Sequence, residues 1–464
     1  MTIVTPVSTS FKTEWWTQRL AGPVIAAAVV RLALLGLTLA RTGTVGITMA
    51  DTASYLIPGR NLLLHGQFVA DGVPDMVRTP GYALFLAITS LAGLPAAALA
   101  NIILSLFSIV LVWKLGRAVF GDDRIALGAA WIFAFEPMSV LFSISLMSET
   151  LFLLLFLLSM ERLAEFLRGR RLRVLAVAGL WLAAATFVRP VTYYLPVPLA
   201  LGIFVVLARE RGLRWKAPAV LLISALPWLA AWQLRNWVET GYSGFSSIAD
   251  ASLYFVNDVE LTARLEHHSS ADVMKELGYS QFTGRSGQMY LAQPYVDRHP
   301  EQAGWNQTQR LAFMHTESLR VIRANSGLYL RTCLKGLFTT VFSPGVGYYD
   351  RLVSPIDPGR IASLVDKNPV SWERELARTH PWTAAEKAAF VALLLAMYLF
   401  AARGLFRADR HNACLWLLLG TALYFLAISG ATGGLSGARY RIPVMPAVCI
   451  LAAAGIQRKR TIAR

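Results

Sequence analysis

The polar stretch between two strongly apolar segments, residues 49–82, carries the residue types that acid–base chemistry needs. Its charged residues are Asp51, Asp71, Asp75, Arg60, Arg78 and His65. Asp51 follows the first apolar segment closely, where a carboxylate near the bilayer edge loses hydration and needs a partner or a function. We therefore interpret Asp51 as a catalytic base. Solvation of the loop, or an ion pair with Arg60 or Arg78, is the structural alternative.

Several arginines lie at the outer ends of the apolar segments, where the positive-inside rule disfavours them. The sides are assigned from the basic loops, of which 162–173 is the strongest and marks the cytoplasm. The topology built on such loops places another set at the opposite ends of the apolar segments: Asp51, Arg78, Glu149, Arg189, Arg235, Arg439 and Arg441. Because guanidinium groups bind phosphate bidentately, this set predicts a site for an anionic lipid phosphate. Pairing with acids, or snorkelling to head groups, is the alternative for any single arginine.

Glu149 lies in the sequence SISLMSETLF, where the pattern predicts the first turn of a helix. Acids are favourable at helix N-termini, and Ser148 is a suitable capping residue, so Glu149 has a local explanation. The functional interpretation is that Glu149 positions the acceptor or one of the arginines.

The composition is that of a polytopic helical membrane protein. The chain has 464 residues, of which 55% are hydrophobic and 16% charged, and its mean hydropathy is +0.48. The net charge of +16 would suggest nucleic acid in a soluble protein. Here the basic residues lie between apolar segments, where they set topology and meet lipid head groups, so no nucleic-acid partner is expected. The three cysteines show no disulfide or zinc pattern.

The apolar segments predict about ten transmembrane helices with both chain ends in the cytoplasm. The first span is expected at 22–40, with Arg31 facing the bundle interior and pairing with an acid or with carbonyls. Residues 80–94 are too few to span a bilayer and predict a juxtamembrane or re-entrant helix. Residues 326–342 are partly apolar but contain two basic residues, which predicts a surface or re-entrant helix. A membrane-spanning helix is the alternative for this segment.

Three parts of the chain differ in composition. Residues 1–236 form an N-terminal transmembrane module that includes a first outer loop, 41–95. Residues 237–384 form one large polar region whose acids and bases roughly balance, which places it on the extracytoplasmic side. Residues 385–464 form the C-terminal transmembrane helices. There is no internal repeat of the kind that many transporters show.

Several motifs carry a resemblance to a known superfamily. They are Asp51 with Tyr55, RTPGYALFLA, WIFAFEPMSVLFSISLMSETLF, GLWLAAATFVRPVTYYLP, PWLAAWQLRNWVETG and, around Tyr440, GARYRIPVMPA. In this order they resemble bacterial GT-C glycosyltransferases, the relatives of protein O-mannosyltransferases and of the aminoarabinose and galacturonic acid transferases. The resemblance covers most of the chain except the large polar region.

The resemblance implies an all-α GT-C bundle in the plasma membrane with an active site at its extracytoplasmic face. It implies an inverting transfer of a sugar from a polyprenyl-phosphate donor to a hydroxyl of a lipopolysaccharide, wall polysaccharide, lipid or protein. The acid of the first outer loop corresponds to Asp51, while Tyr55, Tyr440, Glu149 and the arginines would bind substrate. Many relatives carry adjacent acids there, whereas this chain has Thr52. One carboxylate is a poor divalent-cation site, so no cofactor is assigned, and a cation completed by Asp71 or Asp75 is left open.

Two other functions remain open from the residues alone. One is a lipid-linked sugar flippase or transporter, and the other is a non-catalytic assembly subunit with a similar scaffold. The transferase is preferred because the polar residues gather at one face of the membrane, whereas transporters bind substrate near the midplane.

Overall fold

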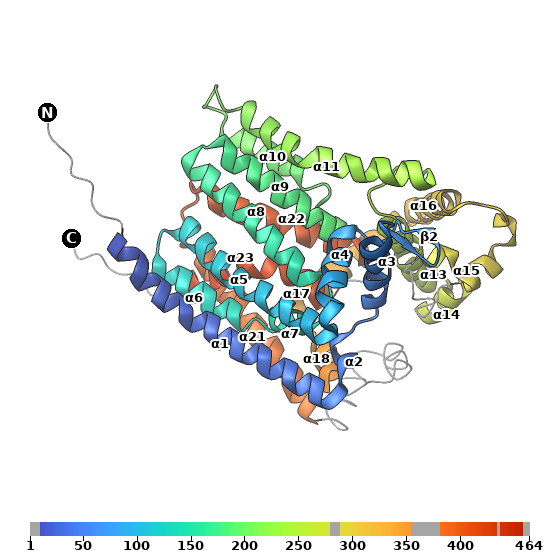
Figure 1. Ribbon diagram of the computed structural model, residues 1–464, viewed down its shortest axis with the longest axis horizontal. Helices are drawn as coiled ribbons and strands as arrows, with labels where there is room; N and C mark the ends of the chain where they lie inside the picture. The colour runs from blue at the N-terminus through green and yellow to red at the C-terminus, as the bar shows by residue number, and fades with distance from the viewer. Residues whose placement is uncertain (1–9, 279–287, 354–380, 434–436, 458–464) are drawn as a thin grey trace.

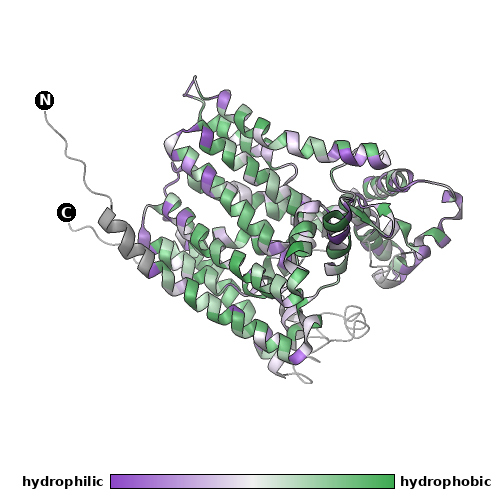
Figure 2. Ribbon diagram, viewed as in Figure 1, coloured by the Kyte–Doolittle hydropathy of each residue, from purple (hydrophilic) through white to green (hydrophobic). Residues whose placement is uncertain are grey.

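The computed structural model describes residues 10–278, 288–353, 381–433 and 437–457. Within them the chain is almost entirely helical, with one two-stranded antiparallel hairpin, β1 (Val69–Ala70) and β2 (Val73–Pro74). A bundle of long helices makes up most of the molecule, and a group of short helices projects from one end of it (Figure 1). Apolar residues cover the bundle, whereas the projecting group is more polar (Figure 2). The predicted all-α polytopic membrane fold is thereby confirmed.

Six helical stretches of the described residues are long and apolar enough to cross a membrane, or seven if one bent pair counts as a span. They are α1 (Ser10–Thr42, from Arg19), α5 (Leu94–Phe120), α11 (Lys216–Thr240), α21 (Pro381–Leu405), α22 (Ala413–Ala431) and η7 with α23 (Ala438–Val444, Met445–Ile456). The bent pair is α6 (Asp123–Ala134) with α7 (Pro137–Ile144), at 55°.

The other expected crossings fall on shorter or more polar helices. These are α8 (Glu149–Gly169), α9 (Leu172–Val188), and η2 with α10 (Pro190–Thr192, Pro196–Val206). α8 packs along α9, and α9 packs along α11, so all of these helices belong to the bundle. The predicted count of about ten spans therefore rests on helices that length and composition alone do not identify as spans.

Arg31 lies inside the bundle, as its position in the first span predicted. The residue is fully buried, its Nη1 donates to the carbonyl of Ala134 at 2.8 Å, and its Nε donates to Ser105 Oγ at 2.9 Å. A cation in an apolar segment is stable only with such partners. Arg31 thus fastens α1 to α5 and α6.

Short helices follow α1 before the bundle resumes. They are α3 (Thr52–His65) and α4 (Pro80–Thr89, continued by η1, Ser90–Ala92), with α2 (Thr44–Ile47) before them. A side chain at Gly59 would lie 2.1 Å from the carbonyl oxygen of Ala83, so α3 and α4 touch through their backbones. Gly81 in turn lies against the carbonyl of Phe187 at the end of α9. These contacts hold the segment predicted as an outer loop against the bundle, with α4 as the expected short apolar helix.

The projecting group is called here the polar module, residues 242–278 and 288–324. Its helices are α12 (Ile248–Ser252), a π-helix η3 (Leu253–Asp258), α13 (Val259–Glu266), α14 (Ser270–Glu276), η4 (Met289–Leu291), α15 (Gln293–Arg298), η5 (Pro300–Gln302) and α16 (Gln307–Ala324). Buried tyrosines and Phe255 form its core, which also takes in Met76 and Val77 from the segment before α4. The module is therefore packed onto that segment.

α17 (Ser326–Phe342) returns from the polar module to the bundle, and α18 (Val346–Val353) follows it. α17 packs against α22 and η7, while Leu330, Leu334 and Phe338 stay more than half exposed on its other face. An apolar stripe at a spacing of four residues is typical of a helix that faces lipid. The expected division at 384 falls within α21, whose start at Pro381 lies three residues earlier.

The topology can be tested directly. In Figure 1 the connections α8–α9 and α10–α11 lie at the end of the bundle opposite the polar module. We expect the first of these connections in the cytoplasm and the polar module outside. In a Cys333→Ser background, an impermeant thiol reagent applied to intact cells should label His268→Cys and not Arg171→Cys. The reverse labelling pattern would contradict the topology.

Candidate functional site

Five helix ends meet where the bundle joins the polar module, and each carries a residue that the sequence singled out. Asp51 immediately precedes α3, Arg78 precedes α4, Glu149 opens α8, Arg189 follows α9, and Arg439 lies in η7. The close backbone contacts of α4 with α3 and α9 bring three of these ends together, and α8 joins them through its packing along α9. The residues come from positions up to 388 apart in the sequence.

These five residues form a continuous ion-pair cluster. Arg78 Nη2 lies 2.8 Å from Asp51 Oδ1, and Arg439 Nη2 lies 3.4 Å from Asp51 Oδ2. Arg439 Nε is also 3.3 Å from Glu149 Oε1, and Arg189 Nη1 pairs with the same carboxylate oxygen. Arg439 therefore joins the two carboxylates. Three guanidiniums against two carboxylates leave an excess of one positive charge, which suits an anionic ligand.

The cluster is open on the side of Asp51. The Asp51 side chain is 30% exposed, compared with 3% for Glu149. Arg439 and Arg78 are mostly covered, at 22% and 12%. A ligand from solvent can reach Asp51 and its arginines, whereas Glu149 is held behind them as a counter-ion.

Hydroxyl groups and aromatic rings complete the surroundings of the arginines. Arg78 donates from Nε to Ser54 Oγ at 2.9 Å, and its Cζ lies 4.4 Å from the centre of the Tyr55 ring. The Tyr55 hydroxyl lies 3.2 Å from Ser148 Oγ. Arg439 lies over the ring of Tyr440 at 5.2 Å. Tyr55 and Tyr440, which the resemblance indicated, are therefore both beside the cluster.

Ser54 and Ser148 are members of this site that sequence reasoning did not assign to it. Ser148 was expected to cap α8; it occupies the N-cap position, but its side chain makes no capping hydrogen bond and contacts Tyr55 instead. Ser54 stands one helical turn after Asp51, and this spacing is the signal that could have found it. Serines are common at helix starts for local reasons, so the signal is weak.

Electrostatics fix the charge state of Asp51. Burial by itself favours the neutral carboxyl, but the charges of Arg78 and then Arg439, with their hydrogen bonds, outweigh it and hold the pKa of Asp51 well below its usual range. The carboxylate is therefore ionised, but it is a weak base while both arginines remain paired with it.

The structure does not bring two of the predicted arginines to the cluster. Arg441 is buried and donates from Nη1 to the carbonyls that end α17, those of Thr340, Val341 and Ser343. Arg235 donates to the carbonyls of Phe68 and Asp75. Both guanidiniums satisfy main-chain oxygens in the described structure. Their predicted role in binding a phosphate stays a prediction.

The residues around Asp51 do not fit a divalent cation. Each of the Asp51 oxygens faces an arginine, and a hard cation needs several oxygen ligands in place of such neighbours. Asp71 is exposed in the β1–β2 turn, and Asp75 accepts main-chain amide hydrogens. Among the described residues, the one group of three potential ligands whose ligand atoms lie within 4.8 Å of one another is Glu266, His268 and Glu276, which are exposed in the polar module.

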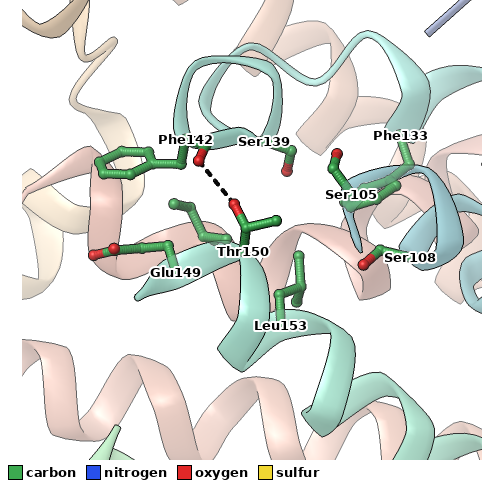
Figure 3. A pocket seen from close by; sticks show the side chains of 9 residues that line it. Ser105, Ser108, Phe133, Ser139, Phe142, Glu149, Thr150 and Leu153 are labelled. Atoms are coloured by element: carbon green, nitrogen blue, oxygen red, sulfur yellow. Dashed lines mark hydrogen bonds between the residues drawn. The ribbon is translucent and has the colours of Figure 1, made fainter. Parts of the chain in front are cut away.

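A small cavity lies behind the first turn of α8. Ser105, Ser108, Ser139 and Thr150 line it, and Thr150 Oγ1 donates to the Phe142 carbonyl at 2.8 Å (Figure 3). Figure 3 shows the Glu149 carboxylate on the side of Thr150 away from Ser105 and Ser108. A volume of about 10 Å³ admits one water molecule and no sugar. This cavity is therefore too small to hold a sugar.

One protein family matches part of the chain. The family described as dolichyl-phosphate-mannose-protein mannosyltransferase matches residues 79–233, which include Glu149 and Arg189. No curated protein matches the chain.

Solved structures resemble the chain at low sequence identity, and the three described here have TM-scores below 0.5. The archaeal oligosaccharyltransferase AglB from Archaeoglobus fulgidus, in complex with an inhibitory peptide and a dolichol-phosphate, is 17% identical, with a TM-score of 0.47 and coverage of 96% of this chain. ArnT from Cupriavidus metallidurans bound to undecaprenyl phosphate is 16% identical, with a TM-score of 0.39 and coverage of 96% of this chain and 78% of its own.

The arabinosyltransferase EmbB from Mycobacterium smegmatis is 12% identical, with a TM-score of 0.32 and coverage of 92% of this chain and 41% of its own. This chain also spans only about half the length of AglB, 50% of it. The match to the mannosyltransferase family over residues 79–233 agrees with the resemblance that the sequence motifs indicated.

Proposed function

We propose that this protein is an inverting glycosyltransferase that moves a sugar from a polyprenyl-phosphate donor to an acceptor hydroxyl at the extracytoplasmic face of the plasma membrane. One observation carries the proposal: a solvent-accessible carboxylate, Asp51, shares two arginines with the site where an anionic ligand would bind. The family match over residues 79–233 supports a sugar donor linked to a lipid phosphate. The acceptor is a glycan, a lipid or a protein hydroxyl.

The arginines would bind the donor phosphate. Arg78 and Arg439 are the two that border the open side, and Arg189 lies behind them on Glu149. As the bond between the anomeric carbon and the phosphate oxygen breaks, its electron pair stays on the phosphate. Preorganised cations stabilise this developing charge, and one such group contributes roughly 3–4 kcal/mol in comparable oxyanion sites.

Asp51 would accept the proton of the acceptor hydroxyl as its oxygen bonds to the anomeric carbon. Attack from the face opposite the departing phosphate inverts that carbon. A retaining reaction needs a second carboxylate as nucleophile. Glu149, the nearest carboxylate of the described cluster, is buried and held by Arg189 and Arg439, which makes it unsuitable for that role.

Donor binding would also make Asp51 a stronger base. The phosphate competes with the carboxylate for Arg78 and Arg439, which now hold the pKa of Asp51 down. When these guanidiniums turn to the phosphate, the carboxylate loses part of its electrostatic stabilisation and its proton affinity rises. The base would thus be activated when the donor is in place.

Replacing Asp51 tests the base assignment. Asp51→Asn keeps the size of the side chain and removes its basic oxygen, so turnover should fall about 10²-fold or more. Turnover is measured on detergent-purified protein with lipid extract of a deletion strain as donor source. Asp71→Asn, on the exposed turn of the same segment, is the matched control and should keep normal turnover.

Binding separates the base from the phosphate contacts. Undecaprenyl phosphate should bind Asp51→Asn at least as well as the unaltered protein, whereas Arg439→Ala should bind it more weakly. Arg60→Ala, an exposed arginine on α3, controls for the loss of positive charge. Near-normal turnover of a well-folded Asp51→Asn protein would exclude the base assignment.

Chelation tests the metal expectation. Because the surroundings of Asp51 do not fit a divalent cation, turnover should be the same with and without EDTA in the assay. Loss of turnover on chelation, restored by Mn²⁺ or Mg²⁺, would show that a cation takes part and would contradict the expectation.

A further inference from the structure

The segment that leads into Arg78 is held by an unbroken series of hydrogen bonds to its carbonyls. Ser247 N donates to Met76 O at 2.8 Å, and Ser246 Oγ donates to Val77 O at 2.7 Å. Arg235 Nη1 donates to Asp75 O at 3.2 Å, and Gln288 Nε2 donates to Pro74 O at 3.4 Å. Four consecutive carbonyls, 74 to 77, are therefore bound by α11 and the polar module.

The side chain of Asp75 completes this arrangement from within. Its residue is fully buried, and its Oδ1 accepts hydrogen bonds from the amides of Val77 at 2.8 Å and of Arg78 at 2.9 Å. An aspartate that accepts hydrogen bonds from the amides two and three residues later fixes a tight turn. The turn sets the direction in which the Arg78 side chain leaves the backbone.

Arg78 then reaches three partners on α3 and just before it. These are Asp51, Ser54 and Tyr55, at 2.8, 2.9 and 3.3 Å. A guanidinium at the end of a long side chain loses this geometry easily if its backbone moves. A displacement of about 1 Å at a binding group is enough to impair catalysis.

We propose that Asp75 is a positioning residue, which holds the 75–78 turn so that the Arg78 guanidinium meets the donor phosphate. The polar module secures the same turn by donating hydrogen bonds to the carbonyls of residues 74, 76 and 77. The inference rests on the proposed function, in which Arg78 binds that phosphate. It gives the polar module a part in the site: helices that contribute no side chain to the cluster determine where one of its arginines lies.

The position of Arg78 can be measured without turnover. In the folded protein Arg78 is 12% exposed and paired, so phenylglyoxal should modify it slowly, as followed by peptide mass spectrometry. Asp75→Ala removes both acceptor bonds, and each lost bond weakens the turn by about 1 kcal/mol, or roughly fivefold in the open population. The labelling rate at Arg78 should rise at least about fivefold.

Two variants sharpen this measurement. Asp75→Asn keeps an oxygen that accepts both amide hydrogens, so the slow labelling of Arg78 should be retained, as it should in the control Asp71→Asn. Ser246→Ala removes the hydrogen bond to the Val77 carbonyl and should also raise the labelling rate at Arg78. This variant tests the proposal even if Asp75→Ala fails to fold. An unchanged rate in Asp75→Ala or Ser246→Ala, or a rise in Asp75→Asn equal to that in Asp75→Ala, would overturn the proposal.

Binding of undecaprenyl phosphate distinguishes this inference from the proposed function. Arg78→Ala and Asp75→Ala should weaken that binding to a similar extent, and the double variant should be no weaker than Arg78→Ala alone. If Arg78 labels faster in Asp75→Ala but Arg78→Ala binds normally, the positioning stands and the phosphate contact fails. Additive losses in the double variant would contradict the positioning.

Discussion

Two carboxylates stand close together at one end of an apolar helical bundle, and the structure of that end depends on their neutralisation. Removing a carboxylate from water without a partner costs several kcal/mol. Arg439 meets this requirement for both acids at once, because it contacts Asp51 and Glu149. Since Arg439 comes from the C-terminal part of the chain, the same contacts tie η7 to the starts of α3 and α8. The site and the closure of the bundle therefore depend on one residue.

The arrangement also explains how a resting site can be stable and still reactive. Asp51 is exposed enough to meet an acceptor, but its arginines keep it a weak base until an anion competes for them. In the proposed reaction a lipid phosphate would bring that negative charge to the place where the sugar departs. The excess positive charge of the cluster would attract that anion, and the polar module contacts the carbonyls of Met76 and Val77, just before Arg78.

The sequence was informative where residue type and local pattern decide the outcome. An arginine inside an apolar span needs hydrogen-bond acceptors, and Arg31 finds carbonyls. The sequence also placed Glu149 in the first turn of a helix, and Glu149 is the first residue of α8. The pairing of Asp51 with Arg78 was one of two interpretations that the residues left open. The sequence could not separate Arg439 from Arg441, two positions apart, because only the three-dimensional path of η7 turns one to the cluster and the other to the end of α17. For Asp75 the sequence left open a metal ligand or an ion-pair partner of an arginine and did not indicate the turn, since a turn that directs another side chain has no signature in composition or spacing.

Lipid and glycan profiling of a deletion strain tests the central claim, the transfer of a sugar from a polyprenyl-phosphate donor, most directly. The account predicts that one polyprenyl-phosphate sugar accumulates and that one glycoconjugate loses a single sugar residue. It predicts further that the unaltered chain reverses both changes and that Asp51→Asn, expressed at the same level, reverses neither. An unchanged lipid-linked sugar pool in the deletion strain, or full restoration by Asp51→Asn, would contradict it.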